Sequence, residues 1–433
     1  MFSTLVNAFK DAEIRKKLLI TLGLMMLFVL GTWIPVPGIS SDVYKASADS
    51  NLLMQLLNSI NGGALSNCAI LALGATPYIF ASIFIKMLAG VIPSWQRLSR
   101  EGEEGMKKIN LYVRIATLIF AIAQAVGIVL HYVSVSAINE NLLFNVPFLT
   151  YMFIGIMLVA GAMFTLWLGE KMTEKGIGNG ISLLIFIGIL SSASIAIYET
   201  IASAVSSVEN LDKLWSIIIF ALVAVIIFFL IVFVDLARRK IKVAFDKQIR
   251  GRKMYGGQSQ DLELKVNASG VMPIIFASSL LAFPHVIIQL TGSNSGFAVW
   301  YSTWLGVGSI VYTIVSALLI FAFTFFWAPF VFDPDQVAKD IQQRGGKVLN
   351  HTPGRQTADY LRTINRRITF FGALFLGLLY LITTLVFSLI STGSLINALT
   401  CAGMLIIVSV AIDFNNKLEE QMMIRNYKGF LKK

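Results

Sequence analysis

Long apolar runs with almost no charge recur along this chain. Four of the clearest cover residues 18–33, 214–234, 311–327 and 370–389. A helix needs about 20 such residues to cross the hydrocarbon core of a bilayer, and irregular backbone cannot face lipid. The runs are too long and too uniformly apolar for barrel strands. They therefore predict membrane-spanning helices.

The composition supports the same class. Only 14% of the residues are charged, 56% are hydrophobic and the mean hydropathy is +0.74. A soluble chain carries roughly a quarter charged residues, so most of this surface must face lipid. We predict an all-α polytopic membrane protein with ten spans, at about 18–36, 75–92, 111–131, 149–168, 180–200, 214–235, 270–290, 308–328, 368–390 and 394–412.

The positive charges orient these spans. Cationic residues avoid the translocated side of a membrane. With the N-terminus in the cytosol, every Lys and Arg except Lys45, Lys86 and Lys213 falls on the cytosolic side. An even number of spans places the C-terminus there too. The net charge of +11 then reflects topology and attraction to anionic lipid headgroups rather than nucleic-acid binding.

Two cytosolic loops, 236–265 and 332–367, are longer than a simple connection needs. Their Gly, Tyr, Gln and basic residues suit docking surfaces for a partner. Ordinary inside-positive loops are the alternative, and the residues alone do not decide between the two.

One motif occurs twice and indicates how the spans are arranged. Residues 74–82 (GATPYIFAS) and 270–278 (GVMPIIFAS) share G-x-x-P-x-I-F-A-S, each at the second span of a five-span half. Since five is odd, the halves run in opposite directions and form an inverted repeat. We predict halves at 1–205 and 206–413, followed by a cytosolic tail at 414–433. Paired Gly and Pro interruptions place the functional site where the halves meet.

The transported species is either a small solute, carried by a secondary transporter, or something larger that passes a wide pore. Ion-coupled transporters commonly hold ionisable residues in mid-membrane, and here Lys86 is the exception in nearly bare spans. Lys86 either binds a substrate anion, or it snorkels to water or lines a wet cavity. Ile79 and Ile275 are equivalent by the repeat and are either core residues or an aliphatic constriction, which suits a long, variable substrate.

The sequence carries none of the common catalytic motifs. It has no H-E-x-x-H, no G-x-S-x-G and no P-loop, and Cys68 and Cys401 lack the spacing of a metal or redox pair. We predict no enzymatic activity, no cofactor and no metal site, so the energy for transport must come from a partner.

Several longer motifs carry a family resemblance. They are residues 34–38 (IPVPG), 62–65 (GGAL), 72–74 (ALG), 167–170 (WLGE), 174–182 (EKGIGNGIS), 251–259 (GRKMYGGQS), 264–267 (LKVN), 356–360 (QTADY) and 425–430 (RNYKGF). Together they make the chain resemble the SecY/Sec61-alpha family, the pore subunits of protein translocons, from end to end.

The resemblance implies an hourglass channel between the two halves with four groups of site residues. The pore ring would be Ala75, Ile79, Ile185, Ile189, Ile275 and Ile406. A plug at about 61–73 would include Gly62, Gly63, Asn67 and Cys68. The lateral gate would include Phe80, Ser82, Lys86, Ser278 and Phe283, with Phe80 facing Phe283. Cytosolic partners would dock on Arg238, Arg239, Arg250, Arg252, Lys253, Thr352, Pro353, Gly354 and Arg355.

The same resemblance implies partners and a location. The expected partners are SecE and SecG, the SecA motor ATPase, the ribosome, signal peptides and nascent secretory chains, anionic lipids, and YidC as an additional candidate. The expected location is the bacterial plasma membrane. Three positions depart from the family pattern: Thr352 replaces an arginine, Lys86 replaces a glutamine, and the plug lacks its frequent basic residue around Cys68.

Overall fold

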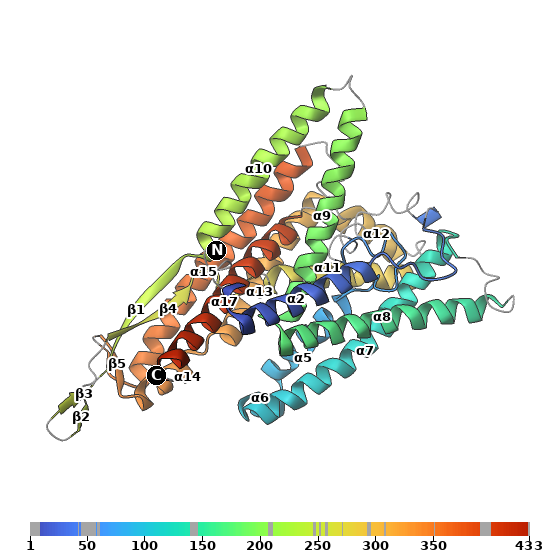
Figure 1. Ribbon diagram of the computed structural model, residues 1–433. Coiled ribbons are helices and arrows are strands. Elements are labelled where there is room, and N and C mark those ends of the chain that lie inside the picture. The colour runs from blue at the N-terminus through green and yellow to red at the C-terminus, as the bar shows by residue number, and fades with distance from the viewer. Residues whose placement is uncertain are drawn as a thin grey trace. The chain divides into compact units, whose positions relative to one another are not determined.

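The computed structural model in Figure 1 is mainly helical. It describes residues 9–41, 43–44, 58, 61–138, 146–206, 211–245, 248–250, 253–255, 259–270, 272–291, 296–306, 309–349, 351–389 and 400–431. Each predicted span is occupied largely by one long helix: α2 (Ala12–Gly31), α5 (Thr76–Val91), α7 (Glu103–Ser134), α8 (Pro147–Lys175), α9 (Gly180–Ser206), α10 (Leu211–Asp235), α11 (Met272–Thr291), α13 (Ile310–Val331), α15 (Arg355–Leu389) and α17 (Cys401–Leu431). The shorter helices are α6 (Pro93–Arg100), α12 (Gly296–Leu305) and α14 (Pro334–Gln343).

The outer surfaces of these helices are apolar. In the described part of the chain, six helices are long and apolar enough to cross a membrane: Glu104–Val133, Pro147–Lys175, Gly180–Ala202, Ile217–Asp235, Ile310–Gln343 and Arg355–Phe387. On α10, Phe229 is 73% exposed and Phe233 is 69% exposed. Apolar exposure of this extent suits lipid and not water. The predicted all-α polytopic class is confirmed, while the number of crossings stays a prediction.

The chain divides into two compact units. Unit 1 comprises Met1–Phe220, Ser279–Ser309 and Leu389–Lys433, and unit 2 comprises Ala221–Ser278 and Ile310–Ser388. The predicted boundary at 205/206 lies inside unit 1, so these units differ from the predicted halves. The inverted two-half arrangement stays a prediction.

In unit 1, neighbouring helices pack in sequence: α5 on α6 and α7, α7 on α8, and α8 on α9. Helix α2 packs against α8 and α9, and α17 also packs against α9. Near the start of α2, Ile14 and Leu18 form a buried cluster with Ile177 and Leu418. Helix α17 continues through most of the predicted tail at 414–433 as part of the same packed unit.

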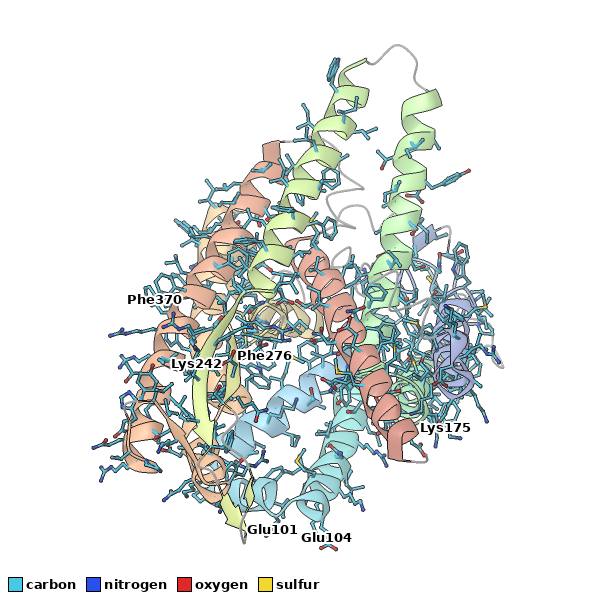
Figure 2. All side chains as sticks on the ribbon, turned by 60° about the vertical axis from the view of Figure 1, so that its left-hand side comes forward. Glu101, Glu104, Lys175, Lys242, Phe276 and Phe370 are labelled. Atoms are coloured by element: carbon cyan, nitrogen blue, oxygen red, sulfur yellow. The ribbon has the colours of Figure 1, made fainter. Side chains whose placement is uncertain are left out.

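Unit 2 contains an antiparallel sheet that the sequence analysis missed. Strands β1 (Arg238–Phe245), β4 (Ser259–Lys265) and β5 (Gly346–Val348) lie in the order β4-β1-β5. Ile241 and Val243 are buried with Leu361 of α15, whereas Lys242 between them is exposed (Figure 2). A separate hairpin pairs β2 (Gln248–Arg250) with β3 (Lys253–Tyr255).

The duplicated motif has the same local geometry in both copies. Gly74 and Gly270 have positive φ angles of 53° and 59°. Each glycine N–H donates to the carbonyl three residues earlier, at 2.9 and 3.3 Å. Pro77 and Pro273 are then the second residues of α5 and α11. The glycines permit a left-handed turn and the prolines suit a first helical turn, so each helix begins abruptly after irregular backbone.

Candidate functional site

The segment 61–75 leads directly into α5 and is mostly buried within unit 1. Its buried polar anchor is Asn61. The Asn61 side-chain amide donates to the Ala72 carbonyl at 2.8 Å, and its Oδ1 accepts from Thr76 Oγ1 at 3.1 Å. One side chain therefore closes the segment into a loop and joins it to the first turn of α5. Because the groups are buried, losing either bond would leave a desolvated polar atom without its partner.

Glycines allow two neighbouring helices to approach this segment closely. Gly62 has φ 72°, and a Cβ atom there would lie 3.2 Å from the Cα of Gly188 on α9. A Cβ atom on Gly161 of α8 would overlap the carbonyl oxygen of Ile70. Both contacts are backbone against backbone. The segment is therefore seated against α8 and α9 at positions where larger residues would displace it.

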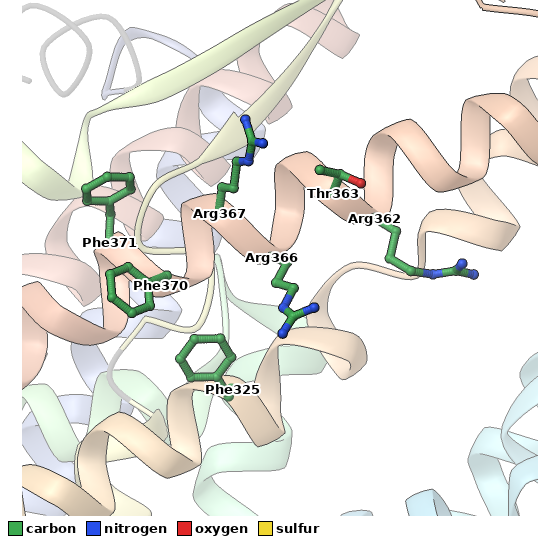
Figure 3. Close-up of a pocket in the computed structure, with 7 residues that line it drawn as sticks. All are labelled: Phe325, Arg362, Thr363, Arg366, Arg367, Phe370 and Phe371. Atoms are coloured by element: carbon green, nitrogen blue, oxygen red, sulfur yellow. The ribbon is translucent and has the colours of Figure 1, made fainter.

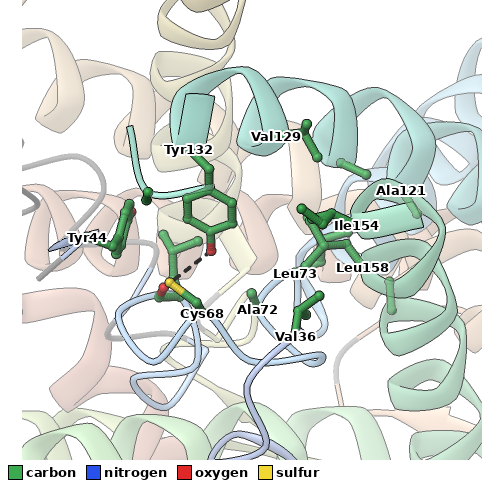
Figure 4. Close-up of a cluster of buried hydrophobic side chains, with 14 residues drawn as sticks. Val36, Tyr44, Cys68, Ala72, Leu73, Ala121, Val129, Tyr132, Ile154 and Leu158 are labelled. Atoms are coloured by element: carbon green, nitrogen blue, oxygen red, sulfur yellow. Dashed lines mark hydrogen bonds between the residues drawn. The ribbon is translucent and has the colours of Figure 1, made fainter. Parts of the chain in front are cut away.

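An apolar cluster holds the segment against α7 and α8 (Figure 4). Cys68 is completely buried in it, and the Tyr132 hydroxyl at the end of α7 donates to the Leu65 carbonyl at 3.4 Å. Asn67 is half-buried, and its amide donates to the Thr32 carbonyl at 3.3 Å. Gly63 has φ 81° and open space where a Cβ would lie. The predicted plug residues thus belong to one docked, irregular segment.

Five of the six predicted ring residues are buried in unit 1. They are Ala75, Ile79, Ile185, Ile189 and Ile406. The packing of α9 against α17 brings together the helix of Ile185 and Ile189 and the helix of Ile406. The sixth, Ile275, lies in unit 2 and is half-buried near the start of α11.

The docked segment contacts backbone beside two predicted ring positions. Gly62 lies against Gly188, which precedes Ile189. Asn61 bonds Thr76, which follows Ala75. The segment 61–75 and part of the predicted ring therefore form one packed site in unit 1.

The predicted gate residues differ in how far they are buried and in the contacts that they make. Phe80 is half-buried, with its ring centroid 6.2 Å from that of Phe120 on α7. Ser82 and Ser278 each donate to a backbone carbonyl of their own helix, at 3.0 and 2.8 Å. Lys86 is exposed on α5. The side chain of Phe283 falls outside the described residues, so its pairing with Phe80 stays a prediction.

The sheet of unit 2 carries ion pairs that include one predicted docking residue, Arg238. Arg238 Nη1 lies 2.7 Å from Glu263 Oε2, and Lys240 Nζ lies 3.3 Å from Glu263 Oε1. These cations, Arg238 first, hold the pKa of the Glu263 carboxyl below its ordinary value. Arg239 is exposed on β1. This surface is basic, and two of its cations are paired with the same carboxylate.

A second group of ion pairs joins the helices beside the sheet. Arg362 Nη2 of α15 donates to both carboxylate oxygens of Asp335 on α14, at 2.9 and 3.0 Å, and Arg362 Nη1 donates to Asp359 Oδ1 at 2.8 Å. The predicted loop 332–367 is therefore largely ordered structure, built from α14, β5 and the start of α15.

Thr352 lies in the short exposed turn before α15. Its carbonyl accepts from Thr357 Oγ1 at 2.8 Å and its N–H donates to Gln356 Oε1 at 3.4 Å. Pro353 is exposed, Gly354 has φ 100°, and Arg355 is the exposed first residue of the helix. The side chains of Thr352, Pro353 and Arg355 are therefore all exposed in this turn. The side chains of Arg250 and Lys253, and all of Arg252, fall outside the described residues.

The sequence analysis missed Gly161 and Gly188, and it did not single out Asn61 within the predicted plug range. A polar residue just before Gly62 and Gly63, and glycines inside apolar spans, are the available signals. Neither signal identifies its contact partner without the fold. Among the residues that the structure describes, no cluster of three His, Cys, Asp or Glu could hold a metal ion.

The fold and site define a multi-pass helical membrane protein in which a buried, irregular segment leads into a helix with a repeated Gly–Pro start. The chain belongs to the SecY family, whose sequence profile matches residues 69–415. It is 36% identical to protein translocase subunit SecY of Mycobacterium tuberculosis over the full length of both chains. Against protein translocase subunit SecY of Thermotoga maritima it is also 36% identical, covering 100% of this chain and 98% of the relative.

Solved structures share the fold at low sequence identity. A structure described as a protein conducting channel gives a TM-score of 0.66 at 19% identity, covering 95% of this chain and 93% of that one. Sec61 in the canine ribosome-channel complex gives 0.62 at 18% identity, with the same coverage. These likenesses support the architecture.

Proposed function

We propose that this chain is the pore subunit of a protein-conducting channel. It translocates unfolded secretory polypeptides across the membrane and releases hydrophobic segments laterally into it. The observation that carries the proposal is the docked segment 61–75, tied by Asn61 to the start of α5 and seated on α9 beside Ile189. A removable segment packed on aliphatic residues suits a channel that must stay sealed at rest.

The aliphatic side chains supply the chemistry of the seal. A ring of Ala75, Ile79, Ile185, Ile189, Ile275 and Ile406 excludes ions by dewetting and has no chemical preference for what stretches it. A polypeptide of any sequence can therefore pass once the plug segment leaves. Phe80, Ser82, Lys86, Ser278 and Phe283 form the lateral gate in this proposal.

The proposed partners follow from the family and the basic surface. Ribosome-bound Sec61 among the similar structures supports the ribosome as a partner. The exposed basic residues of the sheet of unit 2 and of the turn at Thr352 are the proposed docking surface for the ribosome and for the SecA motor ATPase. The other proposed partners are SecE, SecG, signal peptides, nascent secretory chains, anionic lipids and YidC. The location is the bacterial plasma membrane, with both termini in the cytosol and energy supplied by the partner.

A secondary transporter for a small solute is the alternative function. The two are separated by reconstituting the chain with its copurifying subunits in proteoliposomes. With a motor ATPase and ATP, an unfolded secretory precursor should become protected from added protease. If the precursor stays accessible to protease while radiolabelled small solutes accumulate in the proteoliposomes, the result would support the transporter.

A further inference from the structure

An aromatic and basic pocket lies on unit 2 where α15 enters its predicted membrane span (Figure 3). It has a volume of about 520 Å³ and lies between α13 and α15. Phe325 comes from α13, and the residues from α15 include Arg362, Arg366, Arg367, Phe370 and Phe371. Arg366, Arg367 and these three phenylalanines take no part in the functional site described above.

The pocket is polar at one end and apolar at the other. Arg366 and Arg367 are the last charged residues of α15 before the apolar stretch that begins at Ile368. Phe370 and Phe371 follow one helical turn deeper, since a turn takes about 3.6 residues. For the predicted span at 368–390, this spacing puts the arginines at the depth of lipid headgroups and the phenylalanines at the depth of acyl chains.

The charges of the three arginines are not balanced alike. Arg362 is paired with Asp335 and Asp359. In the part of the chain that the structure describes, no carboxylate lies within ion-pair distance of Arg366 or Arg367. Both side chains are exposed. The pocket thus holds positive charge that an external anion would neutralise.

Arg366 shares its side of α15 with an aromatic wall. In Figure 3 it extends toward Phe325, whereas Arg367 extends to the other side of the helix with Phe371. The ring centroids of Phe325 and Phe370 lie 6.5 Å apart, and Phe321 lies 5.9 Å from Phe370. Phe370 is still 46% exposed, so the wall remains open beneath the guanidinium group.

We propose that this pocket binds an anionic phospholipid. Its phosphate lies against the positive charge of the Arg366 guanidinium, and an acyl chain lies along Phe370 and Phe325. A zwitterionic choline headgroup would bring a cation toward the same arginines, so the pocket favours an anionic headgroup. The pocket gives a binding site to the anionic lipids already named among the proposed partners. It requires only that the chain lies in a membrane and does not depend on protein conduction.

Photo-crosslinking in nanodiscs tests the site with the full chain and any subunits that copurify. The probe is phosphatidylglycerol with a diazirine in its acyl chain, compared with phosphatidylcholine carrying the same chain. We expect the phosphatidylglycerol adduct to map to Phe325 and Phe370. Arg366→Gln should reduce this adduct about fivefold, because one arginine near the surface contributes about 1 kcal/mol toward an anionic lipid.

Three comparisons make the outcome decisive. Arg366→Lys, which keeps the charge, should retain most of the adduct, and Arg344→Gln, an equal charge change at the exposed end of α14, should leave it unchanged. Excess glycerol phosphate should not compete, because the acyl chain contributes to binding. Equal labelling by both lipids, an unchanged adduct in Arg366→Gln, or full competition by glycerol phosphate would overturn the proposal.

Discussion

Thr76 Oγ1 donates a 3.1 Å hydrogen bond to Oδ1 of Asn61, and both residues are buried. This bond connects the segment 61–75 to the first turn of α5, the helix that carries Ile79. The start of the proposed plug is therefore held by the same helix whose aliphatic side chain belongs to the proposed seal. Opening the plug requires breaking this buried contact.

Replacing Asn61 with Ala should weaken the docked state. The Thr76 hydroxyl and the Ala72 carbonyl would both lose a buried partner, at a cost of about 1–3 kcal/mol for each group. We expect a higher resting ion conductance in planar bilayers. Asn67→Ala is the matched control, since Asn67 is half-buried and makes a longer bond to Thr32. An equal conductance in both variants would contradict the role of Asn61.

Replacing Gly161 with Ala should also displace the segment. The new Cβ would overlap the Ile70 carbonyl, whereas a Cβ at Gly155 on the same helix would meet nothing within 4 Å. Both changes raise helix propensity by about 1 kcal/mol, so any difference between them reports the contact. Gly161→Ala should increase proteolytic cleavage within 61–75, and Gly155→Ala should not. Identical cleavage rates would argue against close seating on α8.

Polar substitution in the ring should break the ion seal. Asn in place of Ile406, which is 3% exposed, would hydrate the proposed constriction and raise ion conductance. The same change at Ile156, which is 57% exposed on α8, gives a matched control outside the ring. Equal conductance in the two variants would remove Ile406 from the ring. Corresponding Asn variants of Ile79, Ile185 and Ile275 extend the test.

The helices were predictable from the sequence because a long apolar run can cross a bilayer only as a helix. Helices α10 and α13, for example, lie close to their predicted ranges. The repeated motif likewise predicted interruptions at both positions, and the structure shows them as abrupt helix starts after left-handed turns at Gly74 and Gly270. These features depend on local backbone preferences. They carry over from sequence to structure without knowledge of tertiary contacts.

The sheet and the plug contacts depend on long-range pairing, which a single sequence shows poorly. The alternation of Lys240, Ile241, Lys242 and Val243 indicates a strand facing a core, but its charges resemble an ordinary inside-positive loop. Nothing in the apolar sequence around Gly188 identifies Gly62 as its neighbour. The length of the apolar runs and the distribution of charge were stronger signals than either of these patterns.

The Glu263 ion pairs give the sheet a pH dependence. Because the folded pKa of Glu263 lies below its ordinary value of about 4.5, its stabilisation is present above that value and is lost as the pH falls through the lowered pKa. Intrinsic amide exchange itself slows on acidification, so the quantity to measure is the protection factor, which should fall for the amides of β1 and β4 as the pH drops through this range. Glu263→Gln should lack that part of the pH dependence, and an unchanged profile in the variant would contradict the assignment.

The lateral gate predicts a disulfide between two introduced cysteines. Phe80→Cys with Phe283→Cys should crosslink under oxidation and stop export, and reduction should restore it. Phe84→Cys with Phe283→Cys is the control, since Phe84 is the next aromatic residue along α5 that contacts Phe120. Efficient crosslinking of the first pair with normal export would contradict a moving gate at these positions.

The most direct test of the channel is to trap a substrate inside it. A secretory precursor is stalled during translocation, with a photoreactive amino acid in place of Ile275, and the adducts are identified by mass. The account predicts a crosslink between position 275 and the precursor that depends on a functional signal sequence and on the motor's ATP hydrolysis. A stalled precursor that never labels position 275, while small solutes cross the same membrane, would contradict it.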